Sequence, residues 1–218
     1  MKNYHVDYIF FDLDNTIVDS LPFIIECYKY SFSKMKKEFT TDEVDSMLGP
    51  PEDIIFGRIF KSKEKVNSAI SYFREYYKKN YKKGISIYPQ MKETLYKLSE
   101  FYNLSLVTGA TRKHLDSVLE IFDIGNIFGK NIVTSDDVKF YKPNPECLYK
   151  AIDMAHADIS NSIYIGDSVL DLYLSKNIGI EFIGASWGYK GVNSIEKSDC
   201  IHVYEVYTLK DVIDNLYK

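Results

Sequence analysis

The chain has 218 residues, of which 45% are apolar and 27% are charged, a balance typical of globular rather than disordered or fibrous proteins. No run approaches the roughly 18–20 apolar residues that a membrane span needs, so we expect no membrane partner and a cytoplasmic location. The net charge of −4 lacks the strongly basic balance of nucleic-acid-binding proteins, and we expect no nucleic-acid partner. The length fits either one domain or two.

The N-terminal half begins with a predicted strand and continues with helices. Residues 7–13 form a short apolar run that ends in a polar segment. From there to about residue 82, apolar side chains recur at helical spacing in two stretches, Ile25, Tyr28, Phe32 and Met35, and then Val66, Ile70, Phe73 and Tyr77. The sequence Gly49-Pro50-Pro51 predicts a turn between these two stretches.

After Tyr88-Pro89 the pattern changes to short apolar strands that alternate with helices. The predicted strands cover residues 104–107, 131–133, 162–165 and 181–183. This alternation is typical of βαβ units and predicts a parallel sheet with helices on both faces. We therefore expect an α/β, Rossmann-like core made of residues 1–17 and 88–218, interrupted by an all-helical domain at residues 18–87.

Polar segments follow four of the predicted strands, directly or after a short loop. They are Asp12-x-Asp14-x-Thr16, Thr108-Gly109, Lys142-Pro143-Asn144-Pro145 and Gly166-Asp167-Ser168-x-x-Asp171. Ligands of open α/β sheets bind beyond the carboxyl ends of the strands, so these segments are expected to meet in one site. Residues i and i+2 of a strand face the same way, which lets Asp12 and Asp14 point into one crevice.

Crowded carboxylates need a cation, and a set of oxygen ligands suits Mg²⁺. Once such an ion is bound, it and Lys142 can attract a phosphate dianion that bare carboxylates would repel. Asp12 is then a candidate nucleophile that forms an aspartyl phosphate. Asp14 is a candidate general acid for the leaving alkoxide and a general base for the attacking water.

The four segments resemble the four signature motifs of the haloacid dehalogenase-like (HAD) hydrolase superfamily. They read FFDLDNT, LSLVTG, KPNPE and YIGDSVLDL in chain order. The resemblance implies a HAD-type core in which Asp12 is the nucleophile and Asp14 the acid/base. It further implies roles for six other groups: Thr108, Gly109 and Lys142 at the phosphoryl group, Asp167 at the Mg²⁺ with Asp12 and the Asp14 backbone carbonyl, and Thr16 and Asp171 in support of these ligands.

Two positions depart from the usual motifs. Asn15 stands where the family commonly has Gly, although Asn tolerates left-handed backbone angles. Gly109 stands where Asn is common, which removes a side-chain contact near the nucleophile.

The acid at Asp14 argues against a dehalogenase, because a halide leaves without a proton. The helical insertion resembles the small cap of the phosphoglycolate phosphatase-like branch.

We therefore expect a Mg²⁺-dependent phosphatase that hydrolyses a small phosphomonoester through an aspartyl-phosphate intermediate. Inorganic pyrophosphatase and 5′-nucleotidase activities are alternatives on the same residues, a sugar-phosphate mutase is disfavoured, and a catalytically idle binding protein is the non-enzymatic alternative. Arg58 is a candidate contact for a second anionic group of the substrate, with a surface ion pair as the alternative. Both a monomer and a homodimer are compatible with the sequence.

Overall fold

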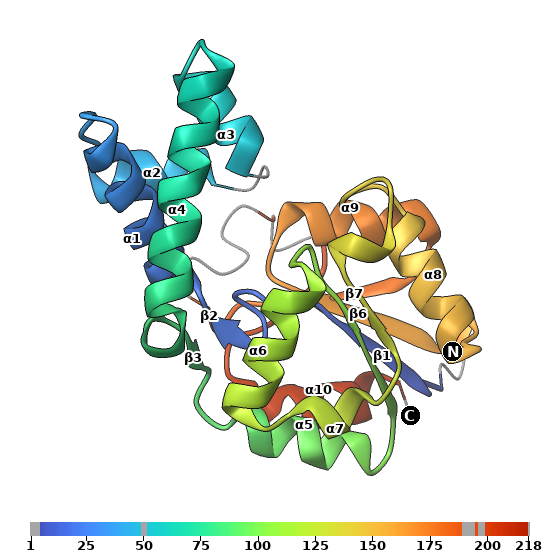
Figure 1. Cartoon of the computed structure of the whole chain (residues 1–218). Coiled ribbons are helices and arrows are strands. Elements are labelled where there is room, and N and C mark those ends of the chain that lie inside the picture. The colour runs from blue at the N-terminus through green and yellow to red at the C-terminus, as the bar shows by residue number, and fades with distance from the viewer. Residues whose placement is uncertain (1–4, 49–51, 189–194, 196–198, 218) are drawn as a thin grey trace. The chain divides into compact units, whose positions relative to one another are not determined.

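Short apolar runs of the sequence form the strands of a six-stranded sheet. In the computed structural model, which describes residues 5–48, 52–188, 195 and 199–217, the sheet has the order β5-β4-β1-β6-β7-β8 and every neighbouring pair is parallel (Figure 1). Its strands are β1 (Tyr8–Phe11), β4 (Asn103–Val107), β5 (Ile132–Val133), β6 (Ser162–Gly166), β7 (Glu181–Ala185) and β8 (Ile201–Val203). The predicted α/β parallel sheet is confirmed, and β8 is an additional edge strand that was not predicted.

The chain divides into two compact units. Unit 1 comprises Met1–Asp19 and Ile87–Lys218, and unit 2 comprises Ser20–Ser86. Two short strands, β2 (Val18–Asp19) and β3 (Ser86–Ile87), pair with each other where the chain passes between the units. The predicted turn at Gly49-Pro50-Pro51 lies outside the described residues. None of the helices in the described part of the chain is long and apolar enough to cross a membrane.

Helices cover both faces of the sheet in unit 1, as alternating strands and helices require. The helices α8 (Glu146–Ala155) and α9 (Val169–Ile178) pack on one face (Figure 1). The other face carries α5 (Met91–Ser99), α6 (Arg112–Phe122), α7 (Gly125–Phe128) and α10 (Leu209–Leu216). Single 3₁₀ turns are present at η1 (Ser135–Asp137), η2 (Ile159–Asn161) and η4 (Val206–Thr208).

Unit 2 is helical and is built around aromatic side chains. Its helices are α1 (Leu21–Lys34), α2 (Thr41–Met47), α3 (Glu52–Ile59) and α4 (Lys63–Gly84). The ring of Tyr28 lies 4.7 Å from that of Phe73 and 5.3 Å from that of Phe56, measured between centroids. The Ser31 hydroxyl donates a 2.7 Å hydrogen bond to the Ala69 carbonyl and so ties α1 to α4. The aromatic stripe of α4 therefore packs into the core of unit 2.

Two glycines of unit 2 should respond in opposite ways to an added methyl group. A Cβ at Gly84 would overlap the buried Phe23 ring, whereas a Cβ at Gly57 on α3 has no atom within 4 Å. Gly84→Ala should lower the free energy of unfolding by about 1–3 kcal/mol through overpacking. Gly57→Ala should raise it by roughly 0.5–1 kcal/mol through helix propensity. Urea unfolding followed by far-UV circular dichroism measures both; equal signs would contradict this packing.

Candidate active site

The register of the sheet brings three polar segments to one edge. Phe11 of β1 pairs with Leu106 of β4 and with Ile165 of β6, so the three strands end at the same level. Asp12 follows β1 directly, Thr108 follows β4, and Asp167 follows β6. The backbone N–H of Asp12 still donates to the Ile165 carbonyl at 2.9 Å, which fixes the start of the loop that carries Asp14. Residues that directly follow these three strands in the sequence therefore lie close together at one edge of the sheet.

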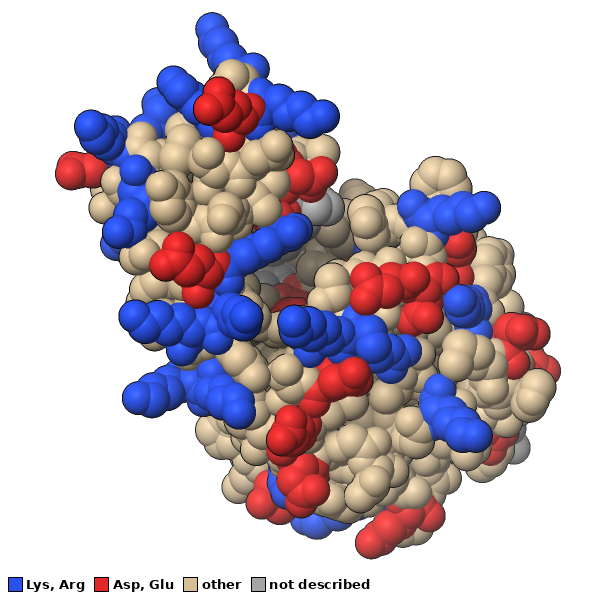
Figure 2. Space-filling model, in the orientation of Figure 1, with Lys and Arg blue, Asp and Glu red and all other residues tan. Residues whose placement is uncertain are grey.

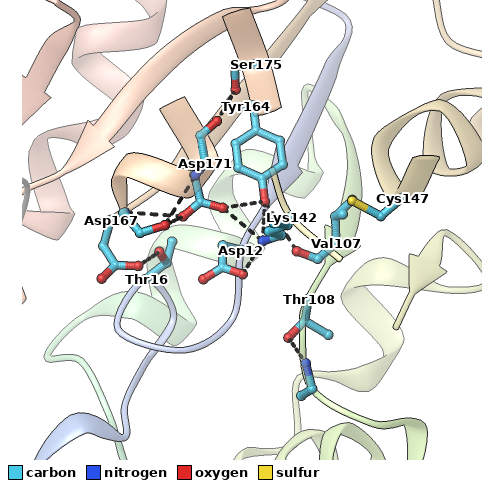
Figure 3. Close-up of polar contacts among 12 residues, drawn as sticks. Asp12, Thr16, Val107, Thr108, Lys142, Cys147, Tyr164, Asp167, Asp171 and Ser175 are labelled. Carbon is cyan, nitrogen blue, oxygen red and sulfur yellow. Dashed lines mark hydrogen bonds and ion pairs between the residues drawn. The ribbon is translucent and has the colours of Figure 1, made fainter. Parts of the chain in front are cut away.

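Three carboxylates cluster beyond this edge. Asp12, Asp167 and Asp171 each offer one oxygen, and these oxygens lie within 4.8 Å of one another (Figure 3). Asp12 and Asp171 are buried, whereas Asp167 is partly exposed. Such a set of hard oxygen donors, crowded and largely shielded from water, suits a divalent cation of the Mg²⁺ type.

Lys142, on the loop before α8, lies beside two of these carboxylates, those of Asp12 and Asp171. Its ammonium donates to Asp12 Oδ1 at 2.6 Å, to Asp171 Oδ1 at 2.9 Å and to the Tyr164 hydroxyl at 2.7 Å (Figure 3). A lysine ammonium has three N–H donors, so these acceptors use all of them. The Lys142 side chain is only 11% exposed, and water competes little for these bonds.

The spacing of Gly166, Ser168 and Asp171 has a local structural reason. Ser168 is the N-cap of α9 and forms a capping box with Asp171, whose Oδ2 accepts from the Ser168 hydroxyl at 2.5 Å and from its N–H at 3.2 Å. A Cβ at Gly166 would stand 2.7 Å from the Asp171 carboxyl group, so only glycine lets this carboxylate approach the strand. Asp171 is thus held on both oxygens.

Asp167 is held more loosely than Asp171. Among the described residues, one side-chain hydrogen bond reaches its carboxylate, from the Thr16 hydroxyl at 3.4 Å. Thr16 is itself fully buried, and its backbone carbonyl accepts from the Trp187 indole N–H at 2.9 Å. Asp167 is therefore a better placed cation ligand than Asp171, whose oxygens are already bonded to Lys142, Tyr164 and Ser168.

The charges of the site are strongly coupled. Burial raises the pKa of Asp12 to about 7, and the neighbouring Asp171 and Asp14 carboxylates add to this rise while Lys142 opposes it. Burial also raises the pKa of Asp167 well above its usual range, with Asp12 contributing. Burial alone would lower the pKa of Lys142, but the Asp12 and Asp171 carboxylates outweigh it and hold that pKa well above its usual range. One ammonium therefore faces several carboxylates.

The other predicted site residues lie in different surroundings. The Asp14 side chain is 36% exposed, and its Oδ1 lies 4.0 Å from Nε2 of His114. Asn15 has the left-handed backbone angle φ of 59°, as expected where the family commonly has Gly. The Thr108 hydroxyl accepts a 3.0 Å bond from the Ala110 N–H. Gly109 is exposed, and a Cβ there would meet no atom within 4 Å.

Arg58 is exposed on α3 of unit 2. Tyr164 is a residue of the site that was not predicted from the sequence. Tyr164 is completely buried on β6, yet its hydroxyl bonds directly to Lys142. In the sequence Tyr164 is one residue of an apolar strand predicted at 162–165, and its only signal is a phenol within a run of aliphatic side chains.

A parallel α/β sheet that gathers carboxylates and a lysine at its strand ends is an arrangement typical of enzymes that bind phosphorylated substrates through a metal ion. More particularly, residues 9–185 match the family model of the haloacid dehalogenase-like hydrolases, and the chain belongs to that family. Pyrophosphatase PpaX of Bacillus velezensis is 30% identical over 215 residues, which cover 93% of this chain and 98% of that protein.

Solved structures share this fold over nearly the whole chain. A predicted phosphoglycolate phosphatase from Haemophilus somnus superposes with a TM-score of 0.83 at 22% identity, and covers 95% of this chain and 97% of its own. A predicted phosphatase from Clostridium acetobutylicum gives a TM-score of 0.83 at 24% identity, and covers 97% of this chain and 100% of its own.

The raised pKa of Asp12 predicts how stability depends on pH without added metal. Between its unfolded pKa, near 3.8, and its folded pKa, about 7, the folded state keeps a proton that the unfolded state has lost. The free energy of unfolding should therefore fall as the pH rises through this window. Asp12→Asn should flatten the fall, because an amide does not titrate.

Urea unfolding in EDTA, from pH 4.5 to pH 7.5, measures this slope. Asp123→Asn is the matched control, because the Asp123 side chain is 79% exposed and lies away from the cluster at the end of α6. It should keep the wild-type slope. An Asp12→Asn protein with the wild-type slope would show that Asp12 does not hold the proton.

Proposed function

We propose that this hydrolase is a Mg²⁺-dependent phosphatase that transfers the phosphoryl group of a small phosphomonoester to Asp12 and then to water. The observation that carries the proposal is the cluster of Asp12, Asp167 and Asp171 at the carboxyl edge of the sheet, with Lys142 bonded to Asp12 and Asp171. Relatives named a pyrophosphatase and a predicted phosphoglycolate phosphatase support the broader class of small phosphorylated substrates.

The residues that would hold Mg²⁺ are the carboxylates of Asp12 and Asp167 with the backbone carbonyl of Asp14. Asp171 would not bind the ion directly, because its oxygens accept hydrogen bonds from Lys142, Tyr164 and Ser168. It would instead hold neighbouring groups of the site in position. When bound, the ion would neutralise the carboxylates and polarise the phosphoryl oxygens. The fit rests on the donor set itself, in which buried carboxylates outnumber the ammonium beside them.

The chemistry of the chain's own residues follows from their exposure. A carboxylate oxygen of Asp12 attacks phosphorus, and the bond from phosphorus to the leaving oxygen breaks. Asp14 donates a proton to that oxygen, then accepts one from the water that attacks the phosphorylated Asp12. The alcohol and inorganic phosphate are the products, and the Asp12 carboxylate is regenerated. The Asp14 side chain is 36% exposed and that of Asp12 only 11%, which suits a group that exchanges protons and a shielded nucleophile.

Lys142 and the segment Thr108-Gly109 are proposed to bind the phosphoryl group. The Lys142 ammonium remains charged, since the carboxylates of Asp12 and Asp171 raise its pKa. A charged group in a shielded site interacts with an incoming phosphate more strongly than it would in water. Thr108 is buried directly after β4, at the strand end next to Asp12. Gly109 has no side chain, so its backbone N–H is accessible to a phosphoryl oxygen.

Inorganic pyrophosphate is a second candidate substrate. The specific observation in its favour is that the relative from Bacillus velezensis, which this chain matches over nearly its whole length, is named a pyrophosphatase. The same residues can cleave it, because phosphate simply replaces the alcohol as the leaving group. The second phosphate of pyrophosphate would carry further negative charge, which requires an additional cationic group at the substrate-binding site.

Hydrolysis of a panel of phosphate compounds tests the proposal. The panel includes an aryl phosphate, phosphoglycolate, pyrophosphate and nucleoside monophosphates, each with Mg²⁺ and with EDTA. Wild type should need Mg²⁺, and Asp12→Asn should lose about a thousandfold or more in kcat, because the nucleophile is gone. Asp123→Asn should keep its activity. Equal rates in wild type and Asp12→Asn, or no effect of EDTA, would contradict the mechanism.

Unit 2 has the charge expected of a surface that attracts anions. Residues 20–86 contain 13 Lys and Arg against nine Asp and Glu, whereas the rest of the chain contains 14 against 22. Figure 2 shows Lys and Arg side chains spread over the face of unit 2 that it draws. Clustered positive charge raises the local concentration of an anionic substrate. We propose that unit 2 is the specificity cap and that Arg58 binds a second anionic group.

Arg58→Ala tests this role through the choice of substrate. It should raise KM for a substrate with a second anionic group about tenfold, the equivalent of 1.4 kcal/mol. It should leave the aryl phosphate nearly unaffected, because that compound has no second anionic group. Lys65→Ala, which removes an exposed cation from α4, is the control. Equal effects of Arg58→Ala on both substrates would exclude the specificity role.

A further inference from the structure

Tyr164 is a buried phenol whose only polar atom points into the site. It is the largest fully buried side chain of the described residues, and its ring stacks on Phe182 with centroids 6.3 Å apart. The rest of the ring lies in an apolar cluster with Leu148 and Leu172. The position of the hydroxyl group is therefore set by the core of unit 1.

The hydroxyl of Tyr164 connects Lys142 to the rest of the site. It accepts from the Lys142 ammonium at 2.7 Å, and its own proton can go to Asp171 Oδ1 at 3.1 Å or to the Val107 carbonyl at 3.3 Å (Figure 3). The ammonium therefore contacts Tyr164 through the hydroxyl group, as the donor of a hydrogen bond.

Of the three acceptors of Lys142, only Asp12 changes its charge and bonding during the proposed reaction. It does so when it takes the phosphoryl group. Tyr164 takes no part in that chemistry, and Asp171 is fixed by the capping box of α9. Two of the three hydrogen bonds can therefore persist while the third is exchanged for a phosphoryl oxygen.

We propose that Tyr164 is a positioning residue that, together with Asp171, holds the Lys142 ammonium at one point while Asp12 is phosphorylated and dephosphorylated. This rests on the proposed function, in which Asp12 carries the phosphoryl group. Preorganised charges stabilise a transition state without reorganisation at the moment of reaction. An ammonium released from this anchor would have to be repositioned in each half-reaction.

A phenol suits this position better than a further carboxylate would. Burial and the charge of Asp171 raise the pKa of Tyr164 well above its usual range, so the group stays neutral. It supplies an acceptor to Lys142 without adding negative charge to the carboxylates already clustered there. A phenylalanine of nearly the same shape would fill the core but leave one N–H of the buried ammonium without an acceptor, which is unfavourable.

The first experiment observes the anchor itself and does not depend on activity. In protein labelled with ¹⁵N-lysine, a buried ammonium bonded to three acceptors should give a slowly exchanging NMR signal, which Lys142→Met assigns by removing it. In Tyr164→Phe the exchange of this ammonium with water should be about tenfold faster. Tyr102→Phe is the matched control, because it removes a phenol that donates to Asp214 and does not contact Lys142.

The second experiment tests whether the anchor matters for the reaction. Tyr164→Phe should lower kcat/KM for the aryl phosphate about tenfold, while Tyr102→Phe stays within about twofold of wild type. In the Lys142→Met background, the further loss caused by Tyr164→Phe should shrink to less than about twofold, because Tyr164 acts through Lys142. A merely structural role would give the same loss in both backgrounds.

The outcomes separate the anchor from the proposed function. A fast-exchanging Lys142 ammonium in the wild type, or unchanged exchange in Tyr164→Phe, overturns the proposal whether or not the protein hydrolyses phosphates. The wild-type measurement also decides the case if Tyr164→Phe does not fold. Faster exchange with unchanged kcat/KM overturns the positioning role. A wild type without Mg²⁺-dependent activity contradicts the proposed function, while the NMR result still decides whether Tyr164 anchors Lys142.

Discussion

Repulsion between buried carboxylates is the constraint that organises this site. Asp12, Asp167 and Asp171 approach within 4.8 Å of one another, and burial raises the pKa of Asp12 to about 7. Like charges in a shielded site are unfavourable unless cations and hydrogen bonds compensate them. Lys142 compensates Asp12 and Asp171, and the cap of α9 compensates Asp171 again. The remaining imbalance is what a bound metal ion would relieve.

The sheet keeps this unfavourable arrangement in place. Parallel strands β1 and β6 end at one level, so backbone hydrogen bonds place Asp12 and Asp167 together, and side-chain bonds add Asp171 and Lys142. Apolar side chains of β1 and β6 are completely buried between the two helical layers. The stability of the apolar core thus offsets the repulsion between the carboxylates at its edge. Ligands of open α/β sheets bind at this same edge, beyond the ends of the strands.

The sequence predicted the fold and the acidic residues because both depend on local patterns. Alternating apolar runs and helical stripes indicated the parallel sheet, and Asp12 and Asp167 stand directly after strands. The edge strand β8 was missed because Ile201–Val203 is only three residues long and contains a histidine. The bond from Tyr164 to Lys142 joins residues 22 positions apart, and no local pattern distinguishes a phenol that bonds a lysine from one that only fills the core.

The net charge of the whole chain does not show how charge is divided between the two units. A net charge of −4 suggests a mildly acidic protein, but residues 20–86 alone carry a surplus of cations and the remaining residues a larger surplus of anions. In the proposed function, the cations of residues 20–86 attract an anionic substrate, and the carboxylates of the remaining residues bind it only with a metal ion present. The acidic cluster then repels anions in general until a cation and Lys142 together outweigh its charge.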